Sequence, residues 1–505
     1  MTSLLHVEDL TVAFGDRDPV VRGVSFDVAP GECLAIVGES GSGKSVTART
    51  LLGLAGAGSQ VDATTLELQG KPLLHNRDRD WRRIRGRQVG FVLQDALVSL
   101  DPLRTVGHEI GETLRLHRYG SRKLRRARIL ELLTAVGVPE PELRARQLPH
   151  ELSGGQRQRA LIASAIALDP PLLIADEPTT ALDVTIQAQI LDLLRAMKDR
   201  GTGLVLISHD LSVVSRLADR VAVMRDGLFV EQGTVANVLT SPSHPYTQTL
   251  LNAVPAAHRK GTRLSGVSAR SMHDGRRSDP PADTVLLQAD GLVKRFRGPD
   301  GVERTAVSDV SFAIGVGETL GIVGESGSGK TTTARLALAL LAPDAGTVRL
   351  AGEPWSDATE AARRPRRRRI SVIYQDPLSS FDPRWTVRKI IADALPADLY
   401  PDAETRDIRT RELLADVGLE DAHLDRRPLL LSGGQRQRVA IARALAPEPS
   451  LIVCDEPVSA LDVTIQAQVL DLLADLQQRL GLSYLFISHD LGVIHHIADR
   501  VLVMR

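Results

Sequence analysis

Two segments of the chain have the residue types and spacing of a phosphate-binding loop. They read Gly38-Glu39-Ser40-Gly41-Ser42-Gly43-Lys44-Ser45 and Gly324-Glu325-Ser326-Gly327-Ser328-Gly329-Lys330-Thr331. Glycines let backbone N–H groups point at phosphate oxygens, the lysine adds a positive charge, and the final hydroxyl can hold Mg²⁺. One match can arise by chance, but both copies follow a short apolar run and precede a helix-like stretch. The sequence therefore predicts two nucleotide sites in one polypeptide.

An apolar run that ends in acids follows each loop along the chain. The runs Leu172–Asp176 and Leu451–Asp455 are unbroken, which is typical of parallel strands buried on both faces. Ligands bind at the carboxyl ends of such strands, so the two aspartates are placed to hold Mg²⁺ through water. Glu177 and Glu456 stand one residue further, where a carboxylate can orient an attacking water. A solvated acidic strand end is the alternative, and repetition beside a phosphate loop makes it the weaker one.

Further matched segments show that the repeat covers most of the chain. The loops begin at residues 38 and 324, a lag of 286, and Leu-Ser-Gly-Gly-Gln begins at 152 and 431, a lag of 279. Ser-His-Asp begins at 208 and 488, a lag of 280. A near-constant lag over such distances indicates duplication of a whole domain.

The duplication sets the expected domain boundaries. The first copy is expected at residues 4–253 and the second at 284–505, joined by a connector at 254–283 that is rich in Arg, Ser, Gly and Pro. Such a composition predicts a flexible tether. The last residue, Arg505, aligns with Arg225 of the first copy, so we expect the second copy to lack its closing segment and to be truncated at its C-terminus.

Composition narrows the class of protein. Lys plus Arg equals Asp plus Glu, 62 against 62, so no overall field favours nucleic acid or an anionic membrane surface. Two cysteines, Cys33 and Cys454, cannot supply a four-cysteine zinc or iron–sulfur site, and their apolar surroundings predict buried free thiols. The N-terminus has no signal-peptide pattern, and no apolar run reaches the roughly 18 residues that span a bilayer. We expect a soluble, cytoplasmic chain.

Several more motifs together resemble one family, the ATP-binding-cassette (ABC) ATPases. They are the two Leu-Ser-Gly-Gly-Gln segments, the glutamines Gln94 and Gln375, the Ala-Leu-Asp segments at 181–183 and 460–462, and the histidines His209 and His489. The resemblance covers nearly all of the chain apart from the connector. It implies an α/β fold with two tandem P-loop ATPase cassettes, each with a mostly parallel core sheet and a helical signature subdomain.

The resemblance implies that each nucleotide is shared by the two cassettes. Cassettes of this family pack head to tail, so Ser153 and Gly155 would face the ATP held by the second loop. Ser432 and Gly434 would face the ATP held by the first. Two opposed cassettes that close on ATP and reopen after hydrolysis would produce a power stroke.

The resemblance also assigns roles to individual residues. Phe14 and Phe296 occupy the position where the family stacks an aromatic ring on adenine. His209 and His489 match the histidine that contacts the γ-phosphate and helps to position the water, with the glutamate of each acid pair as the base. The expected Mg²⁺ ligands of the two sites are Ser45, Gln94, Asp176, Thr331, Gln375 and Asp455. Both copies keep these residues, so we expect two hydrolytic sites.

Longer segments resemble the dipeptide and oligopeptide importers within this family. These are 94–102, 375–383 and His244-Pro245-Tyr246-Thr247. The resemblance implies a motor at the cytoplasmic face of the cell membrane, with two permease subunits and an extracytoplasmic solute-binding protein. Many relatives carry cysteines for an iron–sulfur cluster after the His-Pro-Tyr segment, and none follows it in the first copy.

The alternative is a soluble tandem-cassette ATPase that acts on ribosomes. That class has a long, charged, helical linker, whereas the connector here is short and broken by Gly and Pro. The basic run at 363–369 could suggest RNA contact. The first copy has a similar run at 82–87 in the matching place, so a solvated connector before a strand accounts for both, and we expect no nucleic-acid partner.

Overall fold

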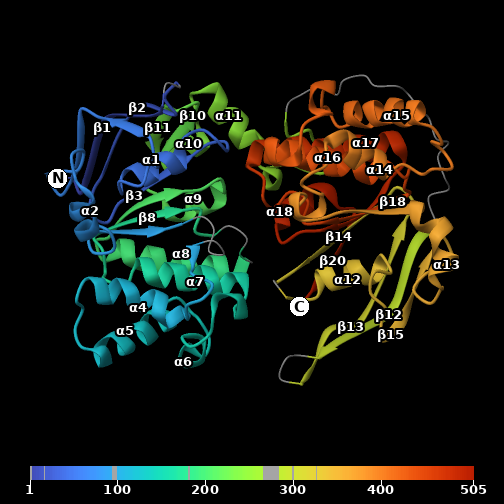
Figure 1. Cartoon of the computed structure of the whole chain (residues 1–505), viewed down its shortest axis with the longest axis horizontal. Coiled ribbons are helices and arrows are strands. Elements are labelled where there is room, and N and C mark those ends of the chain that lie inside the picture. The colour runs from blue at the N-terminus through green and yellow to red at the C-terminus, as the bar shows by residue number, and fades with distance from the viewer. Residues whose placement is uncertain are drawn as a thin grey trace. The chain divides into compact units, whose positions relative to one another are not determined.

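The repeat in the sequence corresponds to two units of structure in the computed structural model, Met1–Leu251 and Asn252–Arg505 (Figure 1). The structure describes residues 3–15, 18–93, 99–179, 182, 184–265, 284–297, 301–325 and 327–505. Gln94, Ser326 and most of the expected connector lie outside these ranges. The second unit begins before residue 284, because part of the expected connector belongs to it.

Each unit contains an antiparallel sheet near its N-terminus. In the first unit the strand order is β2-β1-β5-β6, with β4 also paired to β1. The strands are β1 (Leu5–Phe14), β2 (Val21–Val28), β4 (Ser59–Asp62), β5 (Thr65–Leu68) and β6 (Lys71–Pro72). Buried and exposed residues alternate along most of β2, as expected for a strand with one face on the core.

The second sheet of the first unit carries the chemical motifs. Its order is β11-β10-β3-β9-β8-β7, and all neighbours are parallel except β10 and β11. The strands are β3 (Cys33–Val37), β7 (Val89–Val92), β8 (Leu172–Asp176), β9 (Gly203–Ile207), β10 (Arg220–Arg225) and β11 (Leu228–Thr234). Every residue of β3, β8 and β9 is buried, which explains their unbroken apolar sequences.

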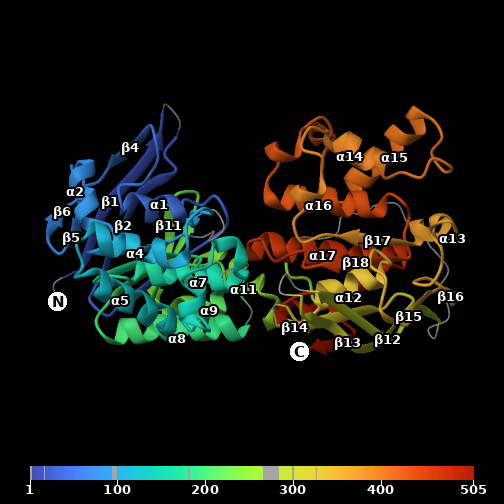
Figure 2. The ribbon, with the colours of Figure 1, turned by 60° about the horizontal axis from the view of Figure 1, so that its bottom comes forward.

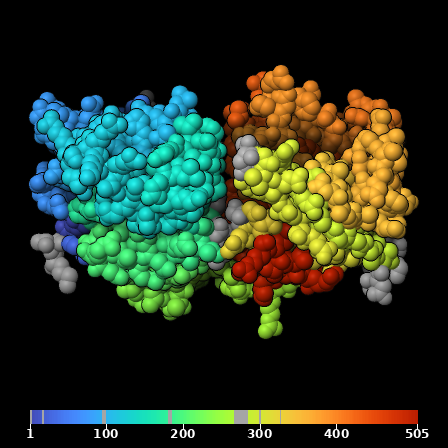
Figure 3. Space-filling model, turned by 90° about the horizontal axis from the view of Figure 1, so that it is seen from below, coloured from blue at the N-terminus to red at the C-terminus, as the bar shows by residue number. Residues whose placement is uncertain are grey.

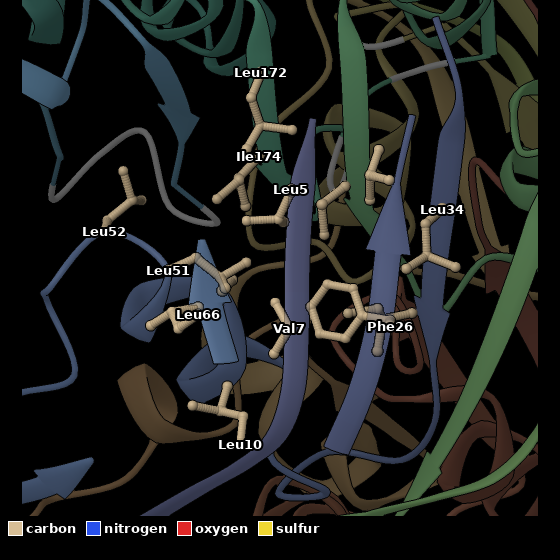
Figure 4. Close-up of a cluster of buried hydrophobic side chains, with 14 of the residues drawn as sticks. Leu5, Val7, Leu10, Phe26, Leu34, Leu51, Leu52, Leu66, Leu172 and Ile174 are labelled. Carbon is tan, nitrogen blue, oxygen red and sulfur yellow. The ribbon is translucent and has the colours of Figure 1, made fainter. Parts of the chain in front are cut away.

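A shared hydrophobic core fixes the two sheets of the first unit against each other (Figure 4). Leu5, Val7 and Leu10 of β1 pack in one cluster with Leu34 of β3 and Leu172 of β8. Each fully buried aliphatic side chain contributes about 1.5–3 kcal/mol relative to exposure. The phosphate loop that follows β3 is thereby held by both sheets.

Helices of the first unit cover the parallel sheet and form a separate helical group. The helices are α1 (Lys44–Thr50), α2 (Asp78–Ile84), α4 (Val106–Leu116), α5 (Arg122–Ala135), α6 (Pro141–Arg144), α7 (Gly154–Ala165), α8 (Val184–Asp199), α9 (Leu211–Leu217), α10 (Val235–Thr240) and α11 (Pro245–Asn252). Helices α4, α5 and α7 pack on one another to form the helical group (Figure 1).

The second unit repeats this plan. Its antiparallel sheet has the order β13-β12-β15-β16 and its parallel sheet the order β17-β18-β19-β14-β20. The strands are β12 (Val285–Arg297), β13 (Glu303–Gly315), β14 (Thr319–Gly324), β15 (Ala345–Leu350), β16 (Glu353–Pro354), β17 (Ile370–Ile373), β18 (Leu451–Asp455), β19 (Ser483–Ile487) and β20 (Arg500–Met504). Strand β20 is the last strand of the described sheet, and Val503 on it is 74% exposed. The C-terminal end of the chain, red in Figure 3, lies on the surface.

The helices of the second unit have the same arrangement. They are α12 (Lys330–Ala337), α13 (Glu360–Arg363), α14 (Val387–Asp393), α15 (Ala403–Asp416), α16 (Gly433–Leu445), α17 (Val463–Leu480) and α18 (Leu491–Ile497). Figure 2 shows α14, α15 and α16 grouped on one side of the parallel sheet. In the described part of the chain, no helix is both long enough and apolar enough to span a membrane.

Arginines of the basic run at 363–369 in the second unit form ion pairs with nearby glutamates. The run forms a short 3₁₀ helix, Arg364–Arg369. Arg366 pairs with Glu353 at 2.6 Å and Arg367 pairs with Glu360 at 2.8 Å. These pairs give the run a local structural role.

The cysteines are buried, as the sequence predicts. Cys33 in β3 and Cys454 in β18 are both free thiols. Burial raises the pKa of both thiols well above the ordinary value, so neither is reactive in the folded protein.

The first part of the expected connector is packed on the second unit. Asp471 of α17 accepts hydrogen bonds from the backbone N–H groups of Leu264 and Ser265, at 3.1 and 2.9 Å, and from the Ser265 hydroxyl at 2.6 Å. Leu264 is 3% exposed. Ala256 lies against α18, where a Cβ added to Gly492 would meet the Ala256 Cβ at 2.8 Å. Residues 255–265 therefore form a strap on α17 and α18.

We expect Asp471→Ala to release this strap. The change removes the acceptor of three hydrogen bonds, and bonds to a charged acceptor contribute about 1.5–3 kcal/mol each. Trypsin should then cut at Arg259, Lys260 or Arg263 severalfold faster, as followed by mass spectrometry of the fragments. Asp398→Asn, at an acid of the same unit away from the strap, should leave the cleavage rate unchanged, and equal rates for both variants would contradict the prediction.

Candidate functional site

The first phosphate loop joins β3 to α1 and has space only for glycine at two positions. Gly38 has φ 149°, and a Cβ there would lie 2.1 Å from the Met224 carbonyl oxygen. Gly43 precedes α1 with φ 106°, and a Cβ there would lie 2.8 Å from the Val20 carbonyl oxygen. These glycines let the backbone pass under β10 and the β1–β2 hairpin, and they leave the N-terminus of α1 open to an anion.

The second loop has the same constraints. A Cβ on Gly324 would lie 2.2 Å from the Met504 carbonyl oxygen, and one on Gly329 would lie 2.2 Å from the Ala306 carbonyl oxygen. In both loops, the two glycines are therefore required by carbonyl oxygens at equivalent positions of the two units.

The loop lysines are buried and hydrogen-bonded to their own loops. Lys44 Nζ donates to the carbonyl oxygens of Gly38 at 2.8 Å and Glu39 at 2.6 Å. Lys330 Nζ makes the equivalent bonds to Gly324 and Glu325 at 2.8 and 2.7 Å. Both lysines are 7% exposed. A buried ammonium that donates to backbone carbonyl oxygens can exchange them for the oxygens of an anion.

The loop hydroxyls meet the aspartates at the strand ends. Ser45 Oγ donates to Asp176 Oδ1 at 3.1 Å, and Thr331 Oγ1 donates to Asp455 Oδ1 at 3.2 Å. Burial raises the pKa of both carboxyls, against the lowering effect of these hydrogen bonds. Asp176 Oδ2 is buried and has no hydrogen-bond partner among the described residues. An unsatisfied carboxylate oxygen beside a hydroxyl fits a hydrated Mg²⁺.

Each glutamate after the strand end contacts the predicted histidine. Glu177 Oε1 lies 3.1 Å from His209 Nδ1, and Glu456 Oε2 lies 3.2 Å from His489 Nδ1. Both glutamates have φ 50°, a left-handed conformation that is uncommon outside glycine. Such backbone strain clusters at functional sites. The structure thus brings together the two residue types that the sequence assigned to water activation.

The glutamine expected in the second site also reaches this pair. Gln375 Nε2 donates to Glu456 Oε2 at 2.9 Å. Its counterpart Gln94 lies outside the described residues. The hydrogen bond with His489 lowers the pKa of Glu456 against the effect of burial, and the same bond raises the pKa of His489.

A capping aspartate that the sequence analysis did not single out positions His209. Asp210 Oδ1 accepts from the backbone N–H groups of Ser212 and Val213, at 2.8 and 3.4 Å, which begins α9 directly after the histidine. Gln187 of α8 donates to Asp210 Oδ2 at 3.1 Å. An acid after Ser-His and before an apolar helix is the signal that predicts this cap.

The signature serines are exposed, and each begins a helix. Ser153 Oγ accepts from the Gln156 N–H at 3.3 Å, and Gln156 Oε1 accepts from the Ser153 N–H at 3.2 Å. Ser432 and Gln435 form the same capping box at the start of α16. Gly155 and Gly434 lie in the first turn of these two helices. These N-termini belong to the helical group of each unit.

The predicted adenine-stacking rings lie on the hairpins that touch the loops. Phe14 ends β1 and is partly buried against the core. Phe296 lies near the end of β12, is 45% exposed and has Lys294 Nζ 5.9 Å from its ring centroid. Val20, directly before β2, and Ala306, in β13, lie on the same hairpins, and their carbonyl oxygens approach the loop glycines.

Tyr246 is a further contact of the first loop that the sequence analysis missed. Its hydroxyl oxygen accepts from the Glu39 N–H at 3.0 Å. The His-Pro-Tyr motif marked the residue, but nothing in the sequence placed it beside a loop about 200 residues earlier.

Comparison with known families agrees with this geometry. The model of the family described as "ABC transporter" matches residues 21–180 and 307–459. The chain belongs to the ABC transporter family. A second model, "Oligopeptide/dipeptide transporter, C-terminal region", matches residues 230–275 of this ABC protein. The predicted family and the predicted α/β fold with two cassettes are therefore confirmed.

Individual relatives align along the whole ABC protein. Oligopeptide transport ATP-binding protein OppD of Mycobacterium tuberculosis is 43% identical and covers 100% of this chain and 94% of its own. Peptidoglycan transport ATP-binding protein YejF of Agrobacterium fabrum is 44% identical over 99% and 91%. Glutathione import ATP-binding protein GsiA of Salmonella typhimurium is 42% identical over 99% and 84%. All three relatives are named as ATP-binding proteins of transport or import systems, which is the class that the sequence predicts.

A solved structure shares the fold of the whole chain. The archaeal ribosome recycling factor aABCE1, solved with the ribosomal stalk protein aP1, is 22% identical with a TM-score of 0.63. The match covers 98% of this chain and 87% of that one. At this identity the likeness shows the tandem-cassette fold alone.

We expect the His489–Glu456 pair to stabilise the protein in a pH-dependent way. Because Glu456 raises the pKa of His489, the contribution is full below the ordinary histidine pKa of about 6.5 and is lost as pH rises through the folded value. His489→Gln should lower the thermal midpoint at pH 6, by the equivalent of about 0.5–1 kcal/mol, and change it less at pH 9. His495→Gln, at an exposed histidine of α18, should not show this pH dependence. The prediction fails if the two variants behave alike.

Proposed function

We propose that this ABC protein is the ATP-hydrolysing motor of an importer for dipeptides or oligopeptides. The observation that carries the proposal is the match of residues 230–275 to the C-terminal region of oligopeptide and dipeptide transporters, within a chain that holds two phosphate loops. The names of relatives support the class, since OppD is an oligopeptide transport protein and GsiA a glutathione import protein.

In the proposed reaction, ATP phosphates bind the loop N–H groups and the lysine. Lys44 exchanges the carbonyl oxygens of Gly38 and Glu39 for phosphate oxygens in the first site, and Lys330 does the same in the second. The loops supply electrostatic stabilisation without covalent chemistry. Adenine would stack on Phe14 or Phe296.

Water activation is assigned to the glutamate and histidine. Glu177 accepts a proton from the attacking water, and His209, held against it at 3.1 Å, orients the carboxylate and contacts the γ-phosphate. Glu456 and His489 have these roles in the second site. The residues that would hold Mg²⁺ are Ser45, Gln94, Asp176, Thr331, Gln375 and Asp455. Bound Mg²⁺ supplies charge neutralisation of the phosphates.

Each site is proposed to include the signature helix of the other cassette. Ser153 and Gly155 would complete the second site, and Ser432 and Gly434 the first. The support is chemical, because each of these helices begins with an exposed serine and an exposed glycine, and a helix N-terminus suits an anion. ATP binding would then close the cassettes, and loss of the γ-phosphate would open them.

Transport requires partners that cross the membrane. We propose two permease subunits and an extracytoplasmic solute-binding protein in the same system, with this chain bound peripherally at the cytoplasmic face. The support is the transport function in the names of all three relatives, together with the absence of a membrane-spanning helix in the described residues.

Changing Glu177 and Glu456 together to Gln should abolish ATP turnover. An amide cannot take the proton of the attacking water, so phosphate release should fall by about 100-fold or more while nucleotide binding is kept. Phosphate release and binding of a fluorescent ATP analogue would be measured on the full chain. Glu142→Gln, at an exposed glutamate of α6, is the matched control. Turnover at the unmutated rate in the double variant would refute the assigned bases.

A co-purification experiment with an N-terminally tagged chain would identify the transport system to which the chain belongs. After gentle solubilisation of source cells, mass spectrometry should recover two multi-span permeases, with or without a solute-binding protein. Cargo uptake by cells that lack this chain would then name the substrate. Recovery of ribosomal proteins without permeases would overturn the importer and support the ribosome-associated alternative.

A further inference from the structure

The hydroxyl of Tyr246 holds one side of the first phosphate loop. Glu39 is the second residue of the loop, and its N–H donates to Tyr246 Oη at 3.0 Å. The carbonyl oxygen of the same residue accepts from Lys44 Nζ at 2.6 Å. Glu39 therefore connects Tyr246 to the lysine that is proposed to bind phosphate.

The ring of Tyr246 is held in place by burial and by an arginine side chain. It is 6% exposed, and the guanidinium carbon of Arg225 lies 4.9 Å from its centroid, a cation–π distance. Arg225 ends β10, and the preceding residue, Met224, supplies the carbonyl oxygen that limits Gly38. The same strand end thus contacts both the loop and the tyrosine that holds the loop.

The Glu231 carboxylate holds the turn before Tyr246 through hydrogen bonds. Glu231 of β11 accepts from the Ser243 N–H and hydroxyl, both at 2.8 Å, and from the His244 N–H at 3.1 Å. His244 Nδ1 in turn accepts from the Tyr246 N–H at 3.1 Å. Although burial acts to raise it, the hydrogen bonds from Ser243 and His244, together with the nearby Thr247 hydroxyl, lower the pKa of Glu231 to about 2. The anchor therefore stays ionised at any physiological pH.

We propose that Tyr246 is a positioning residue for the first nucleotide site, because it holds the Glu39 peptide, and through it Lys44, in the arrangement that receives phosphate. The proposal rests on the function proposed above, since it concerns the ATP affinity of that site. A loop that is ordered before binding loses less conformational freedom on binding, which raises affinity. The His-Pro-Tyr segment would then raise the ATP affinity of the first site, in addition to its packing role in the first unit.

The test isolates the first site in the full chain. Lys330→Ala disables the second loop, and binding of MANT-ATP is measured with and without Tyr246→Phe, which removes the hydroxyl and keeps the ring. We expect the dissociation constant to rise about threefold to tenfold, the effect of one neutral hydrogen bond. The thermal midpoint should stay unchanged, because the ring still packs under Arg225. Glu231→Gln should weaken binding in the same direction.

Matched controls separate positioning from a general structural role. Tyr119→Phe, in the segment that joins α4 to α5, should leave binding unchanged. In a Lys44→Ala background, where only the second loop binds, Tyr246→Phe should have no effect. An unchanged dissociation constant in the first site would overturn the proposal. So would a loss of binding that is equal at both loops or that follows a lower thermal midpoint.

The same experiment distinguishes this proposal from the function it rests on. If Lys44→Ala added to Lys330→Ala leaves MANT-ATP binding intact, the assignment of the nucleotide sites itself is wrong. If Lys44→Ala abolishes binding in that background and Tyr246→Phe does not change it, the site stands and only the positioning role of Tyr246 fails.

Discussion

The close approach of backbone carbonyls to the loop glycines is the constraint on which each unit depends. In the first unit, the Met224 carbonyl oxygen of β10 and the Val20 carbonyl oxygen before β2 occupy the space that a side chain would need. The loop can pass only because Gly38 and Gly43 lack a Cβ. Strand β3 must therefore lie beside β10, and the antiparallel hairpin must cover the loop. The core shared by the two sheets maintains this arrangement.

Buried charge is the second feature, and strand order explains how it is tolerated. Because β3, β9 and β8 are parallel neighbours, Lys44, His209 and Glu177 all follow carboxyl ends at one edge of the sheet. Taking such groups out of water is costly unless each has a partner. The histidine and glutamate satisfy each other, whereas Asp176 Oδ2 has no hydrogen bond among the described residues. Such an unsatisfied oxygen fits the cation that is proposed for this site.

The segment after β11 contributes to both units. Tyr246 in α11 contacts the phosphate loop of the first unit, while residues 255–265 pack on α17 and α18 of the second. Helix α18 begins directly after the Ser-His-Asp motif, with Asp490 as its cap. A single stretch of about 20 residues thus carries contacts to a phosphate loop at one end and, at the other, to the helix that follows the histidine proposed to act in catalysis.

The sequence by itself determined the motifs, the two copies and the α/β class, because these depend on local patterns: apolar runs that end in acids, glycine spacing and constant lags. It also indicated that glutamate and histidine act together, but their direct contact needed β8 and β9 to pair. Tertiary structure alone decided the bond from Glu39 to Tyr246, which joins positions 207 apart, and the strap on Asp471, 206 and 207 apart. Such contacts leave no periodic signal, since a hydroxyl or carboxylate finds its partner only after the chain has folded. Composition predicted a flexible tether over 254–283, yet its residues 255–265 pack on α17 and α18. Gly and Pro content reports local stiffness and not the surface that a segment meets.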